Sequence, residues 1–158
     1  MIANPTVSDT PHAAIDALSF VSGYLYRIVR YAARDLGIRW TALMVLKDLS
    51  LLGPSTQRTL ADVEQVTEPT MTVLLEQMQQ RGWITRNRDP HNGRIKRVAI
   101  TAKGQRELKN AGRVLRERLG GELAGLSAAE LDAIGAALGP LVALLMNKVD
   151  MARQELQA

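Results

Sequence analysis

The chain has 158 residues, of which 46% are hydrophobic and 23% are charged, a composition typical of one globular unit and not of disordered or fibrous chains. It contains no cysteine, which excludes disulfides, thiolate metal sites and cysteine nucleophiles. The net charge is +4, and residues 81–118 hold twelve Lys and Arg against three Asp and Glu, so the positive charge is concentrated in one quarter of the chain.

The sequence also bears on where the protein works. No uninterrupted apolar run reaches the length of a membrane span, and the N-terminal stretch MIANPTVSDTPH lacks the basic and apolar regions of a signal peptide. We therefore expect a soluble, cytoplasmic protein with no membrane partner.

Three helices are expected in the first part of the chain. Apolar residues at three- and four-residue spacing predict an amphipathic helix over 13–35. Gly37 interrupts it, a second helix runs over about 40–51, and LGPST at 52–56 ends that helix. A third helix over 59–66 is too short to stand alone and must pack on its neighbours. Its inward positions are Leu60, Val63 and Val66.

A fourth helix is predicted from its start signals. Thr67 is a suitable N-cap, Pro69 falls near the first turn, and Gly82 follows the end of the helix. The apolar stripe consists of Met71, Leu74, Leu75 and Met78. The opposite face consists of Thr70, Val73, Gln77 and Gln80, with Thr67, Glu68 and Pro69 at its tip. That face is small and mostly polar, and Glu68 is its one expected charge.

The apolar period then changes from that of a helix to that of a strand. WITRNR and IKRVAIT alternate as strands do, and Pro90 with Asn92-Gly93 supplies turn residues between them. The inward side would carry Ile84, Val98 and Ile100. We expect a two-stranded hairpin rich in Arg and Lys.

Two further helices complete the chain. Thr101 caps a fifth helix that reaches about Leu119, and Gly120-Gly121 is expected to break it. The tetrad at 127–130, Ser-Ala-Ala-Glu, is a capping box that opens a sixth helix, and Gly139-Pro140 should bend that helix. The expected inward positions are Leu108, Ala111, Leu115 and Leu119 on the fifth helix, and Leu131, Ile134, Leu138, Leu141, Leu145 and Val149 on the sixth.

The order of these elements is that of a helix-turn-helix followed by a hairpin wing, so the fold class is mainly α with a small β-hairpin. In such a unit the second helix of the pair enters the major groove, about 12 Å wide, and reads base edges. The basic hairpin would lie along the DNA backbone, because phosphate attracts Arg and Lys. An ordinary solvated charged face is the alternative reading of the cationic block.

At residues 55–104, the sequence STQRTLADVEQVTEPTMTVLLEQMQQRGWITRNRDPHNGRIKRVAITAKG resembles the winged-helix core of the MarR family of bacterial transcription regulators. The similar features are a third helix with the sequence pattern TQR.LA, and a recognition helix that begins with PT and ends in Arg81-Gly82. An Asp-Pro wing with a tip arginine follows, and then a Thr-x-x-Gly sequence after the hairpin. GIRWTALMVLKDL and LSAAELDAIGAALGPL also resemble flanking helices of the family. The resemblance covers roughly 13–150.

The resemblance implies roles for particular residues. The residues that it implies read the DNA bases are Thr67, Pro69, Thr70, Thr72, Val73 and Gln77. The residues that it implies contact the DNA backbone or form the wing are Arg58, Arg86, Arg88, Asp89, His91, Arg94, Lys96 and Arg97. Arg94 would be the wing-tip arginine, and Asp89 would shape the wing together with nearby arginines. Asn92-Gly93 stands where the family usually has a second acid, and Val73 occupies a position that is often polar or basic.

The family also implies a homodimer built from the first, fifth and sixth helices, and a small ligand bound near the first two. The expected organisation is a flexible 1–12, dimerisation helices at 13–36 and 102–150, a winged helix-turn-helix at about 38–101, and a tail at 151–158. An aromatic or carboxylate ligand could meet Tyr24, Arg27, Tyr31, Arg39 and Trp40. Core and dimer packing is the competing interpretation of those five residues.

The sequence thus predicts a dimeric repressor that binds double-stranded DNA at a pseudo-palindromic operator and is released by a ligand. The alternative is a winged-helix protein-interaction module whose basic hairpin meets an acidic partner. We expect no enzymatic activity, because no nucleophile–base pair or phosphate-binding loop is present. We expect no cofactor or metal either, because His12 and His91 have no ligand partners at workable spacing.

Overall fold

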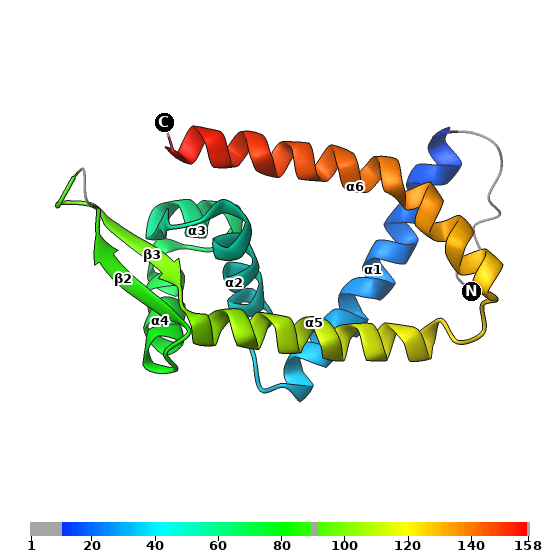
Figure 1. Cartoon of the computed structure of the whole chain (residues 1–158), viewed down its shortest axis with the longest axis horizontal. Coiled ribbons are helices and arrows are strands. Elements are labelled where there is room, and N and C mark those ends of the chain that lie inside the picture. Colours follow the sequence, from blue (N-terminus) through cyan, green and yellow to red (C-terminus); the bar gives the residue numbers. More distant parts are fainter. Residues whose placement is uncertain (1–10, 90–91, 158) are drawn as a thin grey trace.

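The computed structural model describes residues 11–89 and 92–157, and within them the chain forms six helices and a three-stranded antiparallel sheet (Figure 1). The helices are α1 (Pro11–Asp35), α2 (Trp40–Leu52), α3 (Gln57–Val63), α4 (Glu68–Gln80), α5 (Ala102–Glu122) and α6 (Ala128–Gln157). The strands are β1 (Ser55–Thr56), β2 (Ile84–Arg88) and β3 (Lys96–Ile100). The predicted fold class is confirmed.

The core lies where α2, α3, α4 and the sheet meet. All four residues of the predicted α4 stripe, Met71, Leu74, Leu75 and Met78, are buried. They pack with Leu46 of α2, Leu60 of α3 and Ile84 and Val98 of the sheet. The Thr67 side chain accepts a hydrogen bond from the backbone N–H of Thr70, which confirms it as the N-cap of α4. The helix therefore has a fixed start and a fixed buried face.

The sheet contains one strand more than the sequence predicted. β2 and β3 pair from Ile84 opposite Ile100 to Arg88 opposite Lys96, as expected of the hairpin. The two-residue strand β1 adds to the other side of β3, so the expectation of a two-stranded hairpin was incomplete. Two residues are too few to show an alternating pattern, so β1 left no signal in the sequence.

The third helix also differs from its prediction. It begins at Gln57 and ends at Val63, whereas 59–66 was expected. Leu60 is buried as predicted, but Val63 is 49% exposed. The helix ends earlier because Gln65 adopts a positive φ of 52°, which places Val66 outside the helix. That turn sets the direction of α4 relative to α3.

The winged helix-turn-helix joins α5 through a close backbone contact. The Thr101 side chain caps α5 by accepting from the N–H of Gly104, and its hydroxyl donates to the carbonyl of Gly82 at 2.7 Å. A Cβ at Gly104 would lie 2.2 Å from the carbonyl oxygen of Trp83. Only glycine therefore allows α5 to lie this close to the start of β2.

α5 and α6 are both longer than predicted. α5 continues through Gly120-Gly121 to Glu122, and α6 extends through 151–157, where a tail was expected. The capping box is confirmed, since the Ser127 hydroxyl and the Glu130 carboxylate bond to each other's backbone N–H groups. Pro140 lies inside α6, which changes direction in its orange part (Figure 1), as the predicted bend requires.

The terminal helices expose most of their apolar side chains. Every residue from 128 to 140 is exposed, and of the predicted inward positions of α6 only Leu141 and Val149 are partly buried. The expectation that this stripe faces inward is therefore wrong for the single chain. Ala128–Ala152 is long and apolar enough to cross a membrane, by length and composition only, and none of its residues is fully buried. The first half of α1 likewise exposes Ile15, Leu18 and Val21.

Candidate nucleic-acid interface

The outward face of α4 is exposed and carries short polar or apolar side chains. Thr67, Pro69, Thr70 and Gln77 are exposed, and Val73 is 51% exposed. The hydroxyls of Thr67 and Thr70 lie 2.9 Å apart and share a hydrogen bond. Five of the six residues predicted for base readout are thus available on one helix. Glu76 is a further exposed acid of α4.

The sixth predicted base-reading residue, Thr72, is at the edge of that face and is only partly exposed. Its hydroxyl donates to the carbonyl of Glu68 at 2.9 Å and accepts from the side-chain amide of Gln57 at 2.7 Å. Thr72 therefore contacts α3 instead of standing clear of the helix as Thr70 does.

The wing is organised around the buried carboxylate of Asp89. Asp89 is 6% exposed, forms an ion pair with Nε of Arg97, and accepts a hydrogen bond from the N–H of Asn92 at 3.0 Å. The Asn92 side chain in turn accepts from the N–H of Arg94 at 3.2 Å. Asn92 thus helps to shape the turn at the position where the resemblance led us to expect an acid. The predicted role of Asp89 in shaping the wing agrees with this geometry.

The predicted backbone-contacting residues fall into two groups. Arg58, Arg88, Arg94 and Lys96 are exposed. Arg86 and Arg97 are half-buried and bind protein atoms: Arg86 donates to the carbonyl of Thr72 at 3.3 Å, and Arg97 donates to the carbonyl of Pro54 at 3.3 Å in addition to pairing with Asp89. His91 lies outside the described residues.

The five residues predicted for a ligand pocket do not line one cavity. Arg39 and Trp40 border a cavity of about 540 Å³ between α1 and α2, together with Tyr26, Arg30 and Arg34. Tyr24, Arg27 and Tyr31 border a separate hollow of about 180 Å³ against Arg118 of α5. The two groups separate because residues 24, 27 and 31 follow one side of α1, and residues 26, 30 and 34 follow another.

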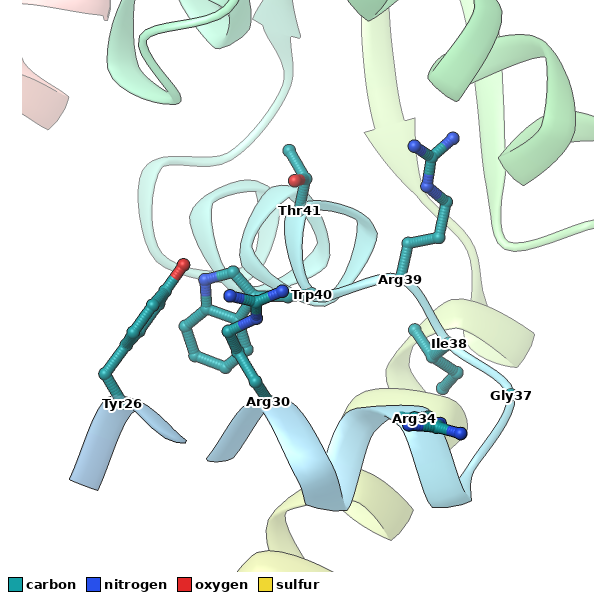
Figure 2. A pocket seen from close by; sticks show the side chains of 8 residues that line it. All are labelled: Tyr26, Arg30, Arg34, Gly37, Ile38, Arg39, Trp40 and Thr41. Carbon is teal, nitrogen blue, oxygen red and sulfur yellow. The ribbon is translucent and has the colours of Figure 1, made fainter. Parts of the chain in front are cut away.

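Figure 2 shows how the larger cavity is built. The rings of Tyr26 and Trp40 lie edge to face with centroids 5.8 Å apart, and the guanidinium of Arg30 lies over the Tyr26 ring. Arg39 points away from this group, and it also borders a small hollow beside Gln77 of α4. The sequence analysis missed Tyr26, Arg30 and Arg34, although their four-residue spacing placed them on one side of the helix.

The loop beside this cavity is also tied to the end of α4. Arg81, the C-cap of α4, donates from Nη1 to the carbonyl of Gly37 at 3.2 Å and stacks its guanidinium over Trp83 at 4.8 Å. Gly37 itself borders the 540 Å³ cavity. The loop from α1 to α2 therefore borders the cavity and also contacts the end of α4.

Two carboxyl groups lie together beneath the helix-turn-helix. Burial, followed by the neighbouring carboxyl of Asp48 on α2, raises the pKa of Glu64, the C-cap of α3, to about 7. Burial also raises the pKa of Asp48, whose Oδ2 atom is buried. The sequence alone does not reveal this pair, because burial cannot be inferred from a single helical acid such as Glu64. Within the described residues, no cluster of three or more His, Asp or Glu could hold a metal ion.

Comparisons with known proteins agree with this geometry. Residues 38–96 match the model of the MarR family. A Mycobacterium bovis protein described as an uncharacterised HTH-type transcriptional regulator is 29% identical over 128 residues, which cover 81% of this chain and 90% of that protein. A Mycobacterium tuberculosis HTH-type transcriptional regulator matches to the same extent.

Solved structures show the same fold. A transcriptional regulator from Thermotoga maritima superposes with a TM-score of 0.71 at 20% identity, covering 88% of this chain and 98% of that one. Wild-type MarR from E. coli, in its apo form, gives 0.67 at 19% identity, covering 80% and 94%. A mutant of S. aureus MepR, solved with a bound oligodeoxyribonucleotide, gives 0.60 at 21% identity, covering 84% and 97%.

The fold and the exposed α4 and wing define a winged helix-turn-helix transcription regulator. More particularly, the winged helix-turn-helix at residues 38–96 is that of the MarR family of DNA-binding, HTH-type transcriptional regulators. The resemblance identified from the sequence is thereby confirmed.

Proposed function

We propose that the protein is a repressor that binds a pseudo-palindromic operator as a homodimer and is released by a small anionic aromatic ligand. The observation that carries the DNA-binding part is the exposed outward face of α4 beside a wing with exposed Arg88, Arg94 and Lys96. Short side chains without positive charge suit base edges in the major groove, and exposed cations suit phosphate. The cytoplasm, where chromosomal DNA lies, is the proposed location.

The homodimer is supported by the exposed apolar faces of the terminal helices. Large apolar side chains that are 40% or more exposed follow one another along α6 from Leu131 to Met151 and along α1 from Ile15 to Tyr24. Contiguous apolar surface of this kind marks an interaction site, and a symmetric dimer covers it with the same surface of a second copy. A second copy of the chain would also explain why an apolar helix as long as α6 lies outside the core.

The wing assignment can be tested by the salt dependence of DNA binding. Each phosphate contact contributes a slope of about −0.9 to the plot of log affinity against log salt concentration. Arg94→Ala should weaken binding to specific and random duplexes alike and flatten the slope by about 0.9, measured by fluorescence anisotropy. Arg106→Ala, which removes an exposed cation of α5, is the control and should leave the slope unchanged. An unaltered slope in Arg94→Ala would contradict the assignment.

The ligand part of the proposal rests on the 540 Å³ cavity. Tyr26 and Trp40 offer aromatic surfaces, and Arg30 and Arg34 offer positive charge for a carboxylate. A ligand there would contact the loop that Arg81 ties to α4, and could favour a dimer whose recognition helices are wrongly spaced for DNA.

A panel of aromatic acids tests this part. At least one member should raise the melting temperature and release operator DNA, and Arg30→Met should weaken both effects together. Arg27→Met, which removes an arginine of α1 that does not line the 540 Å³ cavity, is the matched control. If no aromatic acid in the panel raised the melting temperature or released operator DNA, the result would contradict the ligand proposal. Retention of an acidic protein with no binding to any duplex would favour the protein-interaction module instead.

A further inference from the structure

Three elements of the DNA-binding unit meet at Thr72. Its side-chain oxygen accepts from Nε2 of Gln57, the first residue of α3, at 2.7 Å. Its carbonyl oxygen accepts from Nη2 of Arg86, in the middle of strand β2, at 3.3 Å. One residue of α4 is therefore bonded both to the preceding helix and to the wing.

The hydrogen-bonding capacity of the Thr72 hydroxyl is largely used inside the protein. A hydroxyl has one hydrogen to donate and two lone pairs to accept with. The hydrogen goes to the carbonyl of Glu68 at 2.9 Å, and one lone pair is taken by Gln57. To donate to a base, Thr72 would have to break a bond that the free protein already makes, whereas Thr70 and Val73 are exposed.

Arg86 is held in a comparable way. Its side chain is half-buried, and its Nε atom is buried without a hydrogen-bond partner among the described residues. Moving the guanidinium out to a phosphate would remove its bond to the carbonyl of Thr72. Arg88, two residues further along the same strand, is exposed and has no such constraint.

We propose that Gln57, Thr72 and Arg86 are positioning residues, which fix the orientation of α4 between α3 and the wing and contact neither base nor phosphate. This inference rests on the DNA-binding role of α4 but not on the proposed repression, ligand or operator symmetry. It replaces the roles that the sequence resemblance implied, which were base readout for Thr72 and contact with the DNA backbone for Arg86.

Thr72→Val and Gln57→Met test the bond between α3 and α4, because each keeps the shape of the side chain and removes one partner. The probes are a duplex enriched by the wild-type protein from a random library and a duplex of random sequence. Each variant should bind the enriched duplex about fivefold more weakly, the loss expected for one hydrogen bond. The double variant should lose no more than either single one, since both remove the same contact.

Base preference separates positioning from readout. With Thr72→Val, affinities for all single-base variants of the enriched duplex should fall by the same factor, and affinity for the random duplex should stay unchanged. Thr70→Val is the matched control and should relax the preference at one base pair. Relaxation at one base pair in Thr72→Val would overturn the proposal, as would a change in melting temperature with no change in DNA binding.

The salt slope on the random duplex tests Arg86 independently of any operator. Arg88→Met should flatten the slope by about 0.9, the contribution of one phosphate. Arg86→Met should leave the slope unchanged while it weakens binding to the enriched duplex severalfold. Equal flattening in both variants would show that Arg86 contacts phosphate and would overturn its assignment as a positioning residue.

Discussion

Gly104 occupies a position where any side chain would collide with main chain. A Cβ there would lie 2.2 Å from the Trp83 carbonyl oxygen and 2.9 Å from Cγ1 of Ile100. Gly104→Ala should therefore lower the free energy of unfolding by roughly 2 kcal/mol or more, as overpacking of a core does. Chemical denaturation measures the change.

The matched control for this prediction is Gly120→Ala in the same helix, where an added Cβ meets nothing within 4 Å. It should raise the free energy of unfolding by about 0.5–1 kcal/mol, because alanine is the better helix former. Equal effects of the two substitutions would contradict the close contact between α5 and β2.

Glu64 gives stability a pH dependence whose sign is defined. Its pKa is about 7 in the folded chain against 4.5 for an ordinary glutamate, so the folded state holds a proton that the unfolded state releases earlier. The free energy of unfolding should therefore be highest below pH 4.5, fall as the pH rises to about 7, and then level off for this group. The raised pKa of Asp48 acts in the same direction.

Glu64→Gln removes the titrating group and keeps a side chain of the same shape. Urea unfolding at several pH values should show a flatter decline than in the wild type, whereas Glu76→Gln, on the exposed face of α4, should keep the decline. If the free energy of unfolding varied with pH in the same way in the wild type and in Glu64→Gln, Glu64 and Asp48 would not hold an extra proton in the folded state.

Single residues in the wing show the limit of sequence reasoning at this scale. The resemblance indicated that Asp89 shapes the wing, but its partner Arg97 was assigned to phosphate. The pairing depends on strand register, in which Arg97 lies opposite Asn87, and on the bend that brings Asp89 back toward β3. Neither the register nor the bend is specified by residue types alone.

At the scale of elements, α4 was predicted well because several local signals agree there. The Thr67 cap, Pro69 and a four-residue apolar stripe all point to the same helix, and the stripe is entirely buried. β1 was missed because its structure comes from pairing with β3 and not from its own two residues. The cavity residues of α1 were only partly predicted, because two neighbouring sides of one helix both carry tyrosine and arginine.

The exposed stripe of α6 leads to a prediction about assembly. Leu138 is 40% exposed in the single chain, and we expect a second copy to cover it. Leu138→Glu should shift sedimentation equilibrium from dimer to monomer at micromolar concentration, because burying an unpaired carboxylate is costly. The binding of a two-half-site duplex should weaken in parallel.

Val63→Glu is the control, since Val63 is 49% exposed on α3 and does not belong to a terminal helix. It should leave the dimer intact, which separates loss of the interface from a general effect of added charge. A wild-type chain that sediments as a monomer would contradict the proposed assembly.

At the scale of the whole molecule, the chain combines a DNA-binding part that has a buried core with terminal helices that expose apolar faces. The winged helix-turn-helix has its own buried core, whereas α6 exposes every residue from 128 to 140. The sequence predicted the apolar stripe of α6 but assigned it inward, because periodicity identifies an apolar face without identifying what covers it. We expect the second copy of the proposed dimer to cover that face and to set the spacing of two recognition helices.

The most direct test of this account is a selection of duplexes from a random-sequence library by the full-length wild-type protein. The account predicts enrichment of a pseudo-palindrome, with two inverted half-sites whose centres lie about 10 bp apart, one helical turn of DNA. Enrichment of a single asymmetric site would contradict the dimer arrangement, and the absence of any enriched sequence would contradict base readout by α4.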